Sequence, residues 1–303
     1  MSRTSVIEVR DLKKSYRGQV GRKRVEALKG VSFSIQPGTI TGFLGANGAG
    51  KTTTIKCLLE LAFADSGEIS YFGKKGLTNE AKAKIGFLPE RPYFYDYLTG
   101  REFLKFYGQL SGRISRSELD ARATKLLERV GLGHAGERPL RGYSKGMLQR
   151  IGIAQALIHQ PEFIILDEPM TGLDPDGRFE VREIIREVAS QGTAVFFSSH
   201  LLPDAESLCE RLVILKKGQL IFEGRTAELL GQVESKWQIV FAPSAAASGP
   251  VESLVVETRE ALQGELDRLR MAKNEILEVK VKRMDLEEIF VRMAFDPKSE
   301  VRS

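Results

Sequence analysis

The sequence is poor in cysteine, since only Cys57 and Cys209 occur among its 303 residues. They lie far apart and outside any C-x-x-C spacing, which excludes a zinc ribbon or a redox pair and fits a reducing compartment. No uninterrupted apolar run approaches the length of a membrane span, and the residues after Met1 lead into a strand pattern without the apolar stretch of a signal peptide. If the protein serves a membrane process, we therefore expect a separate polypeptide to span the bilayer.

The net charge is also small, with a formal value of +5 and an isoelectric point near 9.1. Such an excess suits an anionic ligand, an anionic membrane surface or a mixed solvated surface, and it is too small to predict a nucleic-acid partner. One basic loop is either a solvated hairpin tip or a contact to phosphates or lipid headgroups. Its cations are Arg17, Arg22, Lys23 and Arg24. There is no internal repeat that would indicate a second nucleotide-binding domain.

One glycine-rich segment matches the phosphate-binding motif G-x-x-x-x-G-K-[ST] at every fixed position. A β-prone run at 39–44 precedes it and an apolar pattern of helical spacing at 52–61 follows it, which is the required order of strand, loop and helix. Glycines let backbone N–H groups surround an anion, Lys51 brings a positive charge to the β- and γ-phosphates, and the Thr52 hydroxyl suits Mg²⁺. The predicted nucleotide contacts of the loop are Gly45, Ala46, Asn47, Gly48, Ala49, Gly50, Lys51, Thr52 and Thr53.

Strand and helix patterns alternate along most of the chain, which favours an α/β fold with a largely parallel sheet. The predicted strands are residues 6–12, 27–35, 39–44, 68–72, 85–88, 163–166, 194–197, 212–215 and 220–222. Outside the insertion described next, helices are predicted at 52–61 and 178–189. Residues 98–159 read as an all-helical insertion, with helices at 101–110, 117–130 and 145–158.

A domain boundary is predicted after Gly231, so that residues 1–231 form the nucleotide-binding domain. Residues 242–250 are of low complexity and read as a loop, and residues 254–292 follow a strand, helix, strand, helix pattern. Residues 232–303 are therefore expected to form a small α+β accessory domain. It carries no cluster of residues that suggests chemistry, so docking or regulation is the expected role.

Two adjacent carboxylates, Asp167 and Glu168, end the apolar strand predicted at 163–166. In an α/β sheet this is the edge at which strands present residues to a ligand crevice. Asp167 suits Mg²⁺, directly or through water, because this hydrated cation takes few protein carboxylates. Glu168 points elsewhere and suits a general base that deprotonates or orients an attacking water. Without the glycine-rich loop, the pair would be an ordinary acidic strand end.

Taken in order, these motifs resemble those of an ATP-binding-cassette (ABC) ATPase. Residues 140–150 resemble the signature segment of that family, usually written LSGGQ, and Tyr143, Lys145 and Met147 depart from its five-letter form. Ser144 and Gly146 are kept, the hydroxyl and the small residue that allow close approach to a γ-phosphate. A helix that begins here would also direct its free N–H groups at an anion. On its own, the segment would be a routine helix cap.

Three further positions match the family. Asp174, in the sequence Gly-Leu-Asp, lies where the family has its D-loop, and His200 lies where the switch histidine contacts the γ-phosphate. Tyr16 lies where the family stacks an aromatic ring on adenine. Each of these residues alone has a structural explanation, as a helix cap, a strand-end histidine or a packing aromatic.

Glu90 is a departure, because the family has a glutamine there that senses Mg²⁺ and the transmembrane partner. Glutamate keeps an oxygen ligand for the metal but adds a negative charge, which changes the energetics of switching. This glutamate, the Tyr-Ser-x-Gly-Met signature and the C-terminal extension together resemble the ATPase subunits of ABC-2-type transporters, as does the segment at 284–290. The resemblance covers residues 4–230 strongly and the remainder weakly.

The resemblance implies a P-loop NTPase with a RecA-like core, an antiparallel β subdomain and a helical subdomain that carries the signature. It implies two copies, as a homodimer, that close head to tail with ATP between the glycine-rich loop of one and Ser144 to Met147 of the other. Lys51 would hold the phosphates, and Mg²⁺ would bind Thr52, Glu90 and Asp167. Glu168 would activate water, and His200 would contact the γ-phosphate. The subunit would drive export through a separate permease, at the cytoplasmic face of the inner or plasma membrane.

Two other classes of function stay open on the sequence. A soluble ABC-type ATPase that acts on a nucleoprotein complex is one, although such relatives generally carry two cassettes or a long coiled-coil insertion. A nucleotide-binding regulatory module that does not hydrolyse is the other, and the presence of Glu168 and His200 argues against it.

Overall fold

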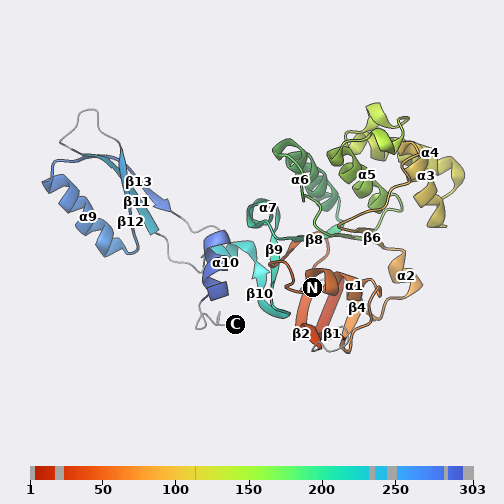
Figure 1. Ribbon diagram of the computed structural model, residues 1–303, viewed down its shortest axis with the longest axis horizontal. Helices are drawn as coiled ribbons and strands as arrows, with labels where there is room; N and C mark the ends of the chain where they lie inside the picture. Colours follow the sequence, from red (N-terminus) through yellow and green to blue (C-terminus); the bar gives the residue numbers. More distant parts are fainter. Residues whose placement is uncertain are drawn as a thin grey trace. The chain divides into compact units, whose positions relative to one another are not determined.

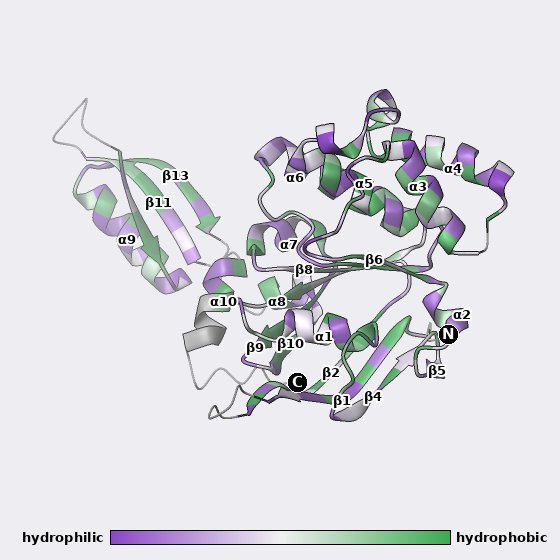
Figure 2. Cartoon of the chain, turned by 45° about the vertical axis from the view of Figure 1, so that its right-hand side comes forward, coloured by the Kyte–Doolittle hydropathy of each residue, from purple (hydrophilic) through white to green (hydrophobic). Residues whose placement is uncertain are grey.

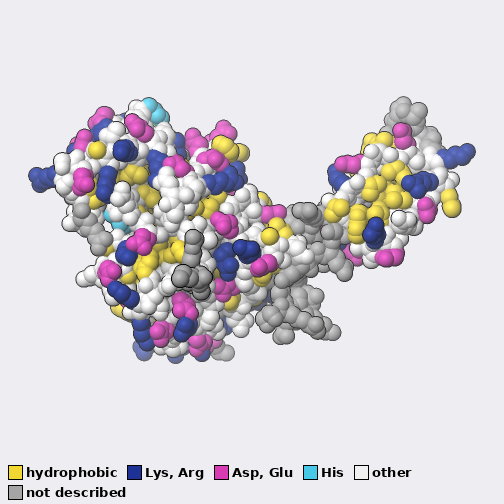
Figure 3. Space-filling model, turned by 180° about the vertical axis from the view of Figure 1, so that it is seen from behind, with side chains coloured by type: hydrophobic (Ala, Val, Ile, Leu, Met, Phe, Trp, Pro, Cys, Tyr) yellow, Lys and Arg dark blue, Asp and Glu magenta, His cyan; other side chains and the backbone are white. Residues whose placement is uncertain are grey.

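The computed structural model describes residues 4–17, 24–112, 114–231, 236–243, 251–282 and 286–295. The chain divides into two compact units, residues 1–224 and 225–303, and each is described by itself. Within the described ranges, every helix is too short or too polar to cross a bilayer. On the face shown in Figure 3, acidic and basic side chains are interspersed over the surface.

The first unit is built on a six-stranded sheet in the order β10-β9-β3-β8-β7-β6. Its strands from β9 to β6 pair in parallel, which confirms the predicted α/β sheet. The strands are β3 (Ile40–Leu44), β6 (Ile85–Leu88), β7 (Phe163–Leu166), β8 (Ala194–Ser199), β9 (Arg211–Lys216) and β10 (Gln219–Arg225). The sequences of β3, β7 and β8 are apolar throughout most of their length because all their residues are buried.

A second sheet lies below the first in Figure 1 and is antiparallel. Its order is β2 (Val25–Ile35), β1 (Ile7–Tyr16), β4 (Ser66–Tyr71) and β5 (Lys74–Lys75). The strand predicted to end at residue 12 continues to Tyr16, because a register shift at Asp11, where φ is +46°, lets β1 bend and keep pairing with β2. The described part of the basic loop includes Arg24, whose guanidinium bonds Asp65 at 2.9 Å.

The main core of this unit fills the space between the two sheets, around helix α1 (Lys51–Leu58). Phe43 and Phe196 from the parallel sheet have ring centroids 4.9 Å apart, and Phe33 from β2 stacks on Phe196 at 5.8 Å. Figure 2 shows the parallel sheet nearly edge-on, with α1 and the antiparallel sheet on one face and α3 to α6 on the other. Packing on both faces fixes the sheet edge from which the functional loops emerge.

The predicted helical insertion is present as α3 (Gly100–Leu110), α4 (Arg116–Arg129) and α5 (Lys145–Leu157). Thr99 and Ser115 begin α3 and α4 with complete capping boxes that use Glu102 and Glu118. Two short 3-10 helices lie between α4 and α5, at Gly133–Ala135 and Leu140–Gly142.

Helix α6 (Pro175–Ser190) begins three residues before the predicted start at residue 178, because Asp174 caps it and Pro175 occupies its first position. The short helices α2 (Asn79–Lys82), α7 (Leu202–Leu208) and α8 (Thr226–Gly231) were not predicted. α7 has no side-chain cap and carries Pro203 in its first turn, so its sequence offered no clear start.

The second unit contains the antiparallel sheet β12 (Glu252–Val256), β11 (Lys236–Ala242) and β13 (Glu275–Lys282), with α9 (Arg259–Met271) and α10 (Leu286–Phe295). Ile239 and Phe241 of β11 and Leu269 of α9 form its small core. The sequence reading missed β11, the central strand, and wrongly placed Ala242 in a loop. The rest of the predicted low-complexity loop, 244–250, lies outside the described residues.

Candidate functional site

The functional residues predicted from separate motifs emerge at one edge of the parallel sheet. Neighbouring strands β3, β8 and β7 run in parallel, so their carboxyl ends lie side by side. Gly45 follows β3, His200 follows β8, and Asp167 follows β7. Glu90 comes two residues after β6, at the same edge. A crevice at the carboxyl ends of parallel strands is the usual ligand site of such a sheet.

The glycine-rich loop connects β3 to α1 in a conformation that only glycine adopts easily. Gly50 has φ +114°, and a Cβ added there would lie 2.8 Å from the carbonyl oxygen of Ala27. The Ala49 carbonyl accepts a hydrogen bond from the backbone of Gly218 at 2.9 Å, which ties the loop to the β9–β10 turn. No side chain caps the first turn of α1, so its first N–H groups are available to bind an anion.

Lys51, the first residue of α1, is 6% exposed. Its ammonium donates to the carbonyl oxygen of Gly45 at 2.6 Å and lies 3.4 Å from the Glu168 carboxylate. The buried cation is therefore held between the loop and the end of β7. Phosphates of a bound nucleotide would compete with Glu168 for it.

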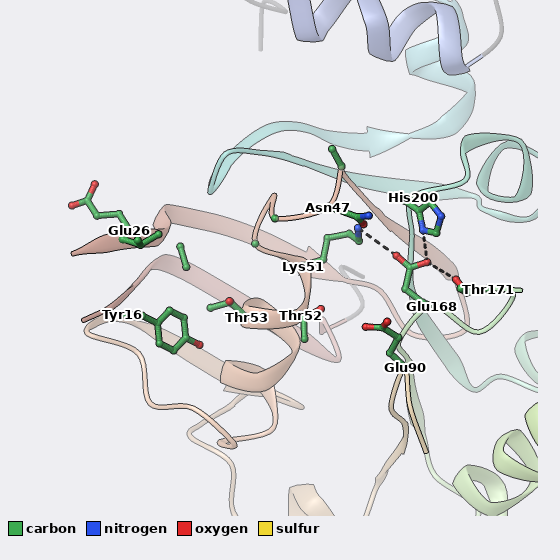
Figure 4. A pocket seen from close by; sticks show the side chains of 15 residues that line it. Tyr16, Glu26, Asn47, Lys51, Thr52, Thr53, Glu90, Glu168, Thr171 and His200 are labelled. Carbon is green, nitrogen blue, oxygen red and sulfur yellow. Dashed lines mark hydrogen bonds and ion pairs between the residues drawn. The ribbon is translucent and has the colours of Figure 1, made fainter. Parts of the chain in front are cut away.

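Glu168 has φ +51°, a conformation that non-glycine residues seldom adopt. Its backbone N–H donates to Ser198 Oγ at 2.9 Å. Its carboxylate oxygen Oε2 lies 2.8 Å from Nδ1 of His200 and accepts a hydrogen bond from Thr171 Oγ1 at 3.0 Å. Figure 4 shows Lys51, His200 and Thr171 converging on this one carboxylate.

Asp167 is 3% exposed, and its carboxylate accepts a 2.6 Å hydrogen bond from Ser198 Oγ. Burial raises the pKa of Asp167, the Ser198 hydrogen bond opposes this shift, and the Glu90 and Glu168 carboxylates add to it. A cation at this position would relieve the repulsion between these acids. A carboxylate or two together with the Thr52 hydroxyl is a donor set that fits Mg²⁺.

Lys51, Glu168 and His200 line a cavity of about 450 Å³, whereas Asp167 is not among its lining residues. Tyr16 and Glu26 lie towards one end and Glu168, His200 and Thr171 towards the other, with Lys51, Thr52 and Thr53 between them (Figure 4). The lining residues are Tyr16, Val25, Glu26, Ala27, Ala46, Asn47, Gly48, Gly50, Lys51, Thr52, Thr53, Glu90, Glu168, Thr171 and His200. The sheet thus brings together residues from five separate predictions.

Four lining residues were missed by sequence reasoning. Val25, Glu26 and Ala27 belong to β2, and they reach the cavity because Val25 pairs with Tyr16 across the antiparallel sheet. The sequence suggested a hairpin here, but its strands were placed at 6–12 and 27–35, so the pairing of Tyr16 with Val25 was missed. Thr171 lies in the turn after Glu168, and a hydroxyl close in sequence to the predicted base was the signal that could have found it.

The signature residues lie elsewhere, since none of residues 143–147 is among the described residues that line the cavity. Ser144 is exposed and caps α5, with its hydroxyl accepting from Met147 N at 3.3 Å. Tyr143 is 7% exposed and donates to the Ala135 carbonyl at 2.7 Å, so its side chain packs inside the helical region. The Lys145 ammonium lies against Gly172, in the turn that leads to the cap Asp174.

Comparisons with known proteins agree with these motifs. The family described as ABC transporter matches residues 28–171. An uncharacterised ABC transporter ATP-binding protein of Synechocystis is 40% identical over 95% of this chain and 84% of its own length. The bacitracin transport ATP-binding protein BcrA of Enterococcus faecalis is 39% identical over 74% and 70%, and the linearmycin resistance ATP-binding protein LnrL of Bacillus subtilis 37% over 75% and 72%.

Solved structures of ABC transporter ATP-binding subunits have the same fold as this chain. An ATP-binding subunit of an ABC transporter has a TM-score of 0.65 and 30% identity, covering 75% of this chain and 93% of that one. A dimeric ATP-binding cassette in a post-hydrolysis state, bound to ADP and Pi, has a TM-score of 0.66 and 25% identity, covering 73% and 98%.

The chain belongs to the family of ABC transporter ATP-binding proteins. It is the ATP-binding subunit of an ABC transporter and hydrolyses ATP, with the predicted P-loop NTPase fold. Subunits of this family generally dimerise and pair with transmembrane permeases. The alternatives of a nucleoprotein-directed ATPase and of a module that does not hydrolyse are not favoured.

Proposed function

We propose that two copies of this subunit close head to tail on ATP, and that hydrolysis at the cavity described above drives an ABC-2-type exporter. The convergence of Lys51, Glu168 and His200 in one cavity is the observation that carries this proposal. A cation for phosphates, a carboxylate base and a second contact for the γ-phosphate are then within reach of one substrate.

Within this site, Lys51 and the N–H groups of the glycine-rich loop bind the phosphates of ATP. Glu168 orients a water molecule and takes its proton at a carboxylate oxygen, a role that contributes about 10²–10⁴-fold in rate. His200 contacts the γ-phosphate, and Tyr16 stacks on the adenine ring. The exposed face of Tyr16, 41% accessible, leaves room for such stacking.

Thr52, Asp167 and Glu90 would hold Mg²⁺. When bound, this ion neutralises charge on the phosphates. The buried Asp167 carboxylate, with Glu90 and Glu168 near enough to raise its pKa, supports the assignment because these acids gain most from a nearby cation.

The signature segment completes the site from a second copy. A Cβ atom added at Gly146 would have no neighbour within 4 Å beyond its own helix backbone and adjoining residues, so packing inside the described chain does not require glycine there. Close approach from outside would require it. The exposed Ser144 hydroxyl and the N-terminus of α5 beside it are suited to a γ-phosphate held by the other copy.

The relatives support the coupling to export. The names of two of them describe bacitracin transport and linearmycin resistance. We therefore propose that the subunit lies at the cytoplasmic face of the inner or plasma membrane, bound to a separate permease. The permease would hold the binding pocket for the cargo.

We also propose that residues 232–303 form an accessory domain for docking or regulation. The separate core at Ile239, Phe241 and Leu269 supports its independence. The compact unit begins at Arg225, slightly before the predicted boundary after Gly231.

The substitution Glu168→Gln tests the catalytic assignment. The amide keeps the size of the side chain but cannot take a proton, so we expect the steady-state ATPase rate to fall by about 10²–10⁴-fold. ATP should still bind, and size-exclusion chromatography should show a dimer that retains it. The matched variant Glu183→Gln, on the exposed surface of α6, should hydrolyse at the wild-type rate. A wild-type rate in Glu168→Gln would contradict the assignment.

A further inference from the structure

Three hydrogen-bond donors or cations share the Glu168 carboxylate. Lys51 lies 3.4 Å from Oε1, whereas His200 and Thr171 contact Oε2 at 2.8 and 3.0 Å. The side chain of Glu168 is 10% exposed, so these groups and not bulk water determine its orientation. They are not equivalent once a nucleotide is present.

Under the proposed function, two of the three turn to the substrate. Lys51 is drawn to the phosphates, because a doubly or triply charged anion attracts an ammonium more strongly than one carboxylate does. His200 contacts the γ-phosphate. Thr171 is the remaining described contact of the Glu168 carboxylate, and its neutral hydroxyl has no comparable attraction to another charge.

The backbone holds Thr171 in place for this contact. Residues 168–171 form a turn in which Thr171 N donates to the Glu168 carbonyl at 3.2 Å. Pro169 fixes one backbone torsion of the turn, and Ser198 holds the N–H of Glu168 from the neighbouring strand. The hydroxyl and the carboxylate are thus the two ends of one short, braced turn. Little conformational entropy is lost when they meet.

We propose that Thr171 is a positioning residue that fixes Oε2 of Glu168 and leaves Oε1 directed at the attacking water once ATP has displaced Lys51. The inference rests on the proposed role of Glu168 as the base. It assigns to the turn after β7 a function in orienting that base. Thr171 itself donates only to the carboxylate and takes no part in proton transfer.

The test compares Thr171→Val and Thr171→Ser in the full chain. Valine keeps the branched shape without the donor, and we expect kcat to fall by about tenfold. KM for ATP should stay within about twofold, because the hydroxyl acts on the base and not on nucleotide binding. Serine restores the donor and should restore most of kcat. The matched control is Thr193→Val, just before the start of β8 and therefore at the end of that strand away from His200. It should leave kcat unchanged.

The double variant Thr171→Val, Glu168→Gln tests whether Thr171 acts through Glu168 or affects hydrolysis independently of it. If Thr171 acts through Glu168, single-turnover hydrolysis by the double variant should match that of Glu168→Gln alone. A further tenfold loss would overturn the inference, as would a wild-type kcat in Thr171→Val or a loss in Thr171→Val that serine does not rescue. A slow Glu168→Gln with a normal Thr171→Val leaves the proposed function intact. A wild-type rate in Glu168→Gln overturns both.

Discussion

The two halves of the proposed ATP site differ in how completely one chain builds them. The glycine-rich half is braced within the chain: Gly50 lies against the Ala27 backbone, Ala49 is tied to Gly218, and Lys51 is held by Gly45 and Glu168. The signature half has an exposed Ser144 and an open Gly146. One half is organised before the substrate arrives, and the other presents a helix end to solvent.

This difference assigns separate tasks to the two halves. A preorganised loop can bind ATP without reordering, so affinity should reside in a single chain. Completion of the site by a second copy would make turnover depend on dimerisation. A monomer should therefore bind ATP but hydrolyse it poorly, and nucleotide favours the closed dimer only through contacts that are better there.

Mixing two inactive variants tests the comparison most strongly. Lys51→Ala removes the phosphate cation, and Gly146→Arg blocks the approach of the signature segment, so each alone should lose at least about 100-fold in hydrolysis. If the halves come from different copies, a mixed dimer contains one intact site. An equimolar mixture should then recover about a quarter of the wild-type rate.

Lys56→Ala, an exposed lysine on the same helix α1, is the control for Lys51→Ala and should be fully active. No recovery in the mixture, despite mixed dimers by crosslinking, would show that both halves of a site come from the same copy. Unchanged ATP affinity in Lys51→Ala would contradict the assignment of the loop.

Alanine substitutions at Gly50 and Gly146 should affect the stability of the chain and its ATP turnover differently. Gly50→Ala places Cβ 2.8 Å from the Ala27 carbonyl oxygen at φ +114°, and we expect the free energy of unfolding to fall by about 1–3 kcal/mol. Gly146 is the second residue of α5, and a Cβ added there would meet open space, so alanine should preserve or raise stability by up to about 1 kcal/mol. The same change should lower hydrolysis several-fold, because the methyl group would lie where the partner's nucleotide approaches.

Thermal denaturation and ATPase assays of both variants check this contrast. If Gly146→Ala destabilised the chain as much as Gly50→Ala, the signature half would be packed within the chain and not open to solvent. Wild-type turnover in Gly146→Ala would remove the argument for close approach by a partner.

The smallest expected effect concerns the buried acid of the braced half. The pKa of Asp167 is raised, mainly by burial, so its ionised form destabilises the nucleotide-free fold at pH values above that raised pKa. Asp167→Asn removes the charge and keeps an acceptor for Ser198. We expect a modestly higher Tm without nucleotide at neutral pH.

The raised pKa of Asp167 also predicts how the Tm difference between variant and wild type depends on pH. As pH falls through the raised pKa, wild-type Asp167 becomes protonated and its penalty disappears, so the Tm difference between variant and wild type should shrink. Calorimetry over a series of decreasing pH values measures this. An equal or lower Tm for Asp167→Asn at neutral pH would contradict the assigned direction.

Local sequence was sufficient for much of the site. The phosphate-binding loop, the carboxylate pair at residues 167 and 168 and the cap at Ser144 were predicted because each depends on neighbours in the chain. The capped helices of the insertion followed from the same kind of signal. By contrast, β11 and α7 were missed, since β11 is followed by a low-complexity stretch and α7 has no side-chain cap.

What the sequence by itself determined is which residues carry the chemistry and how each loop is shaped, because glycine torsions, caps and charges act over a few residues. Only the tertiary structure decided which of them meet. The order β3-β8-β7 places the strand that leads to His200 between the strands that lead to the loop and to Glu168. The pairing of Tyr16 with Val25 brings both residues to the far wall of the cavity. The contact between Lys51 and Glu168 joins residues more than a hundred positions apart. The cavity is lined from both sheets, so the site depends on the packing of the whole core and not on local pattern alone.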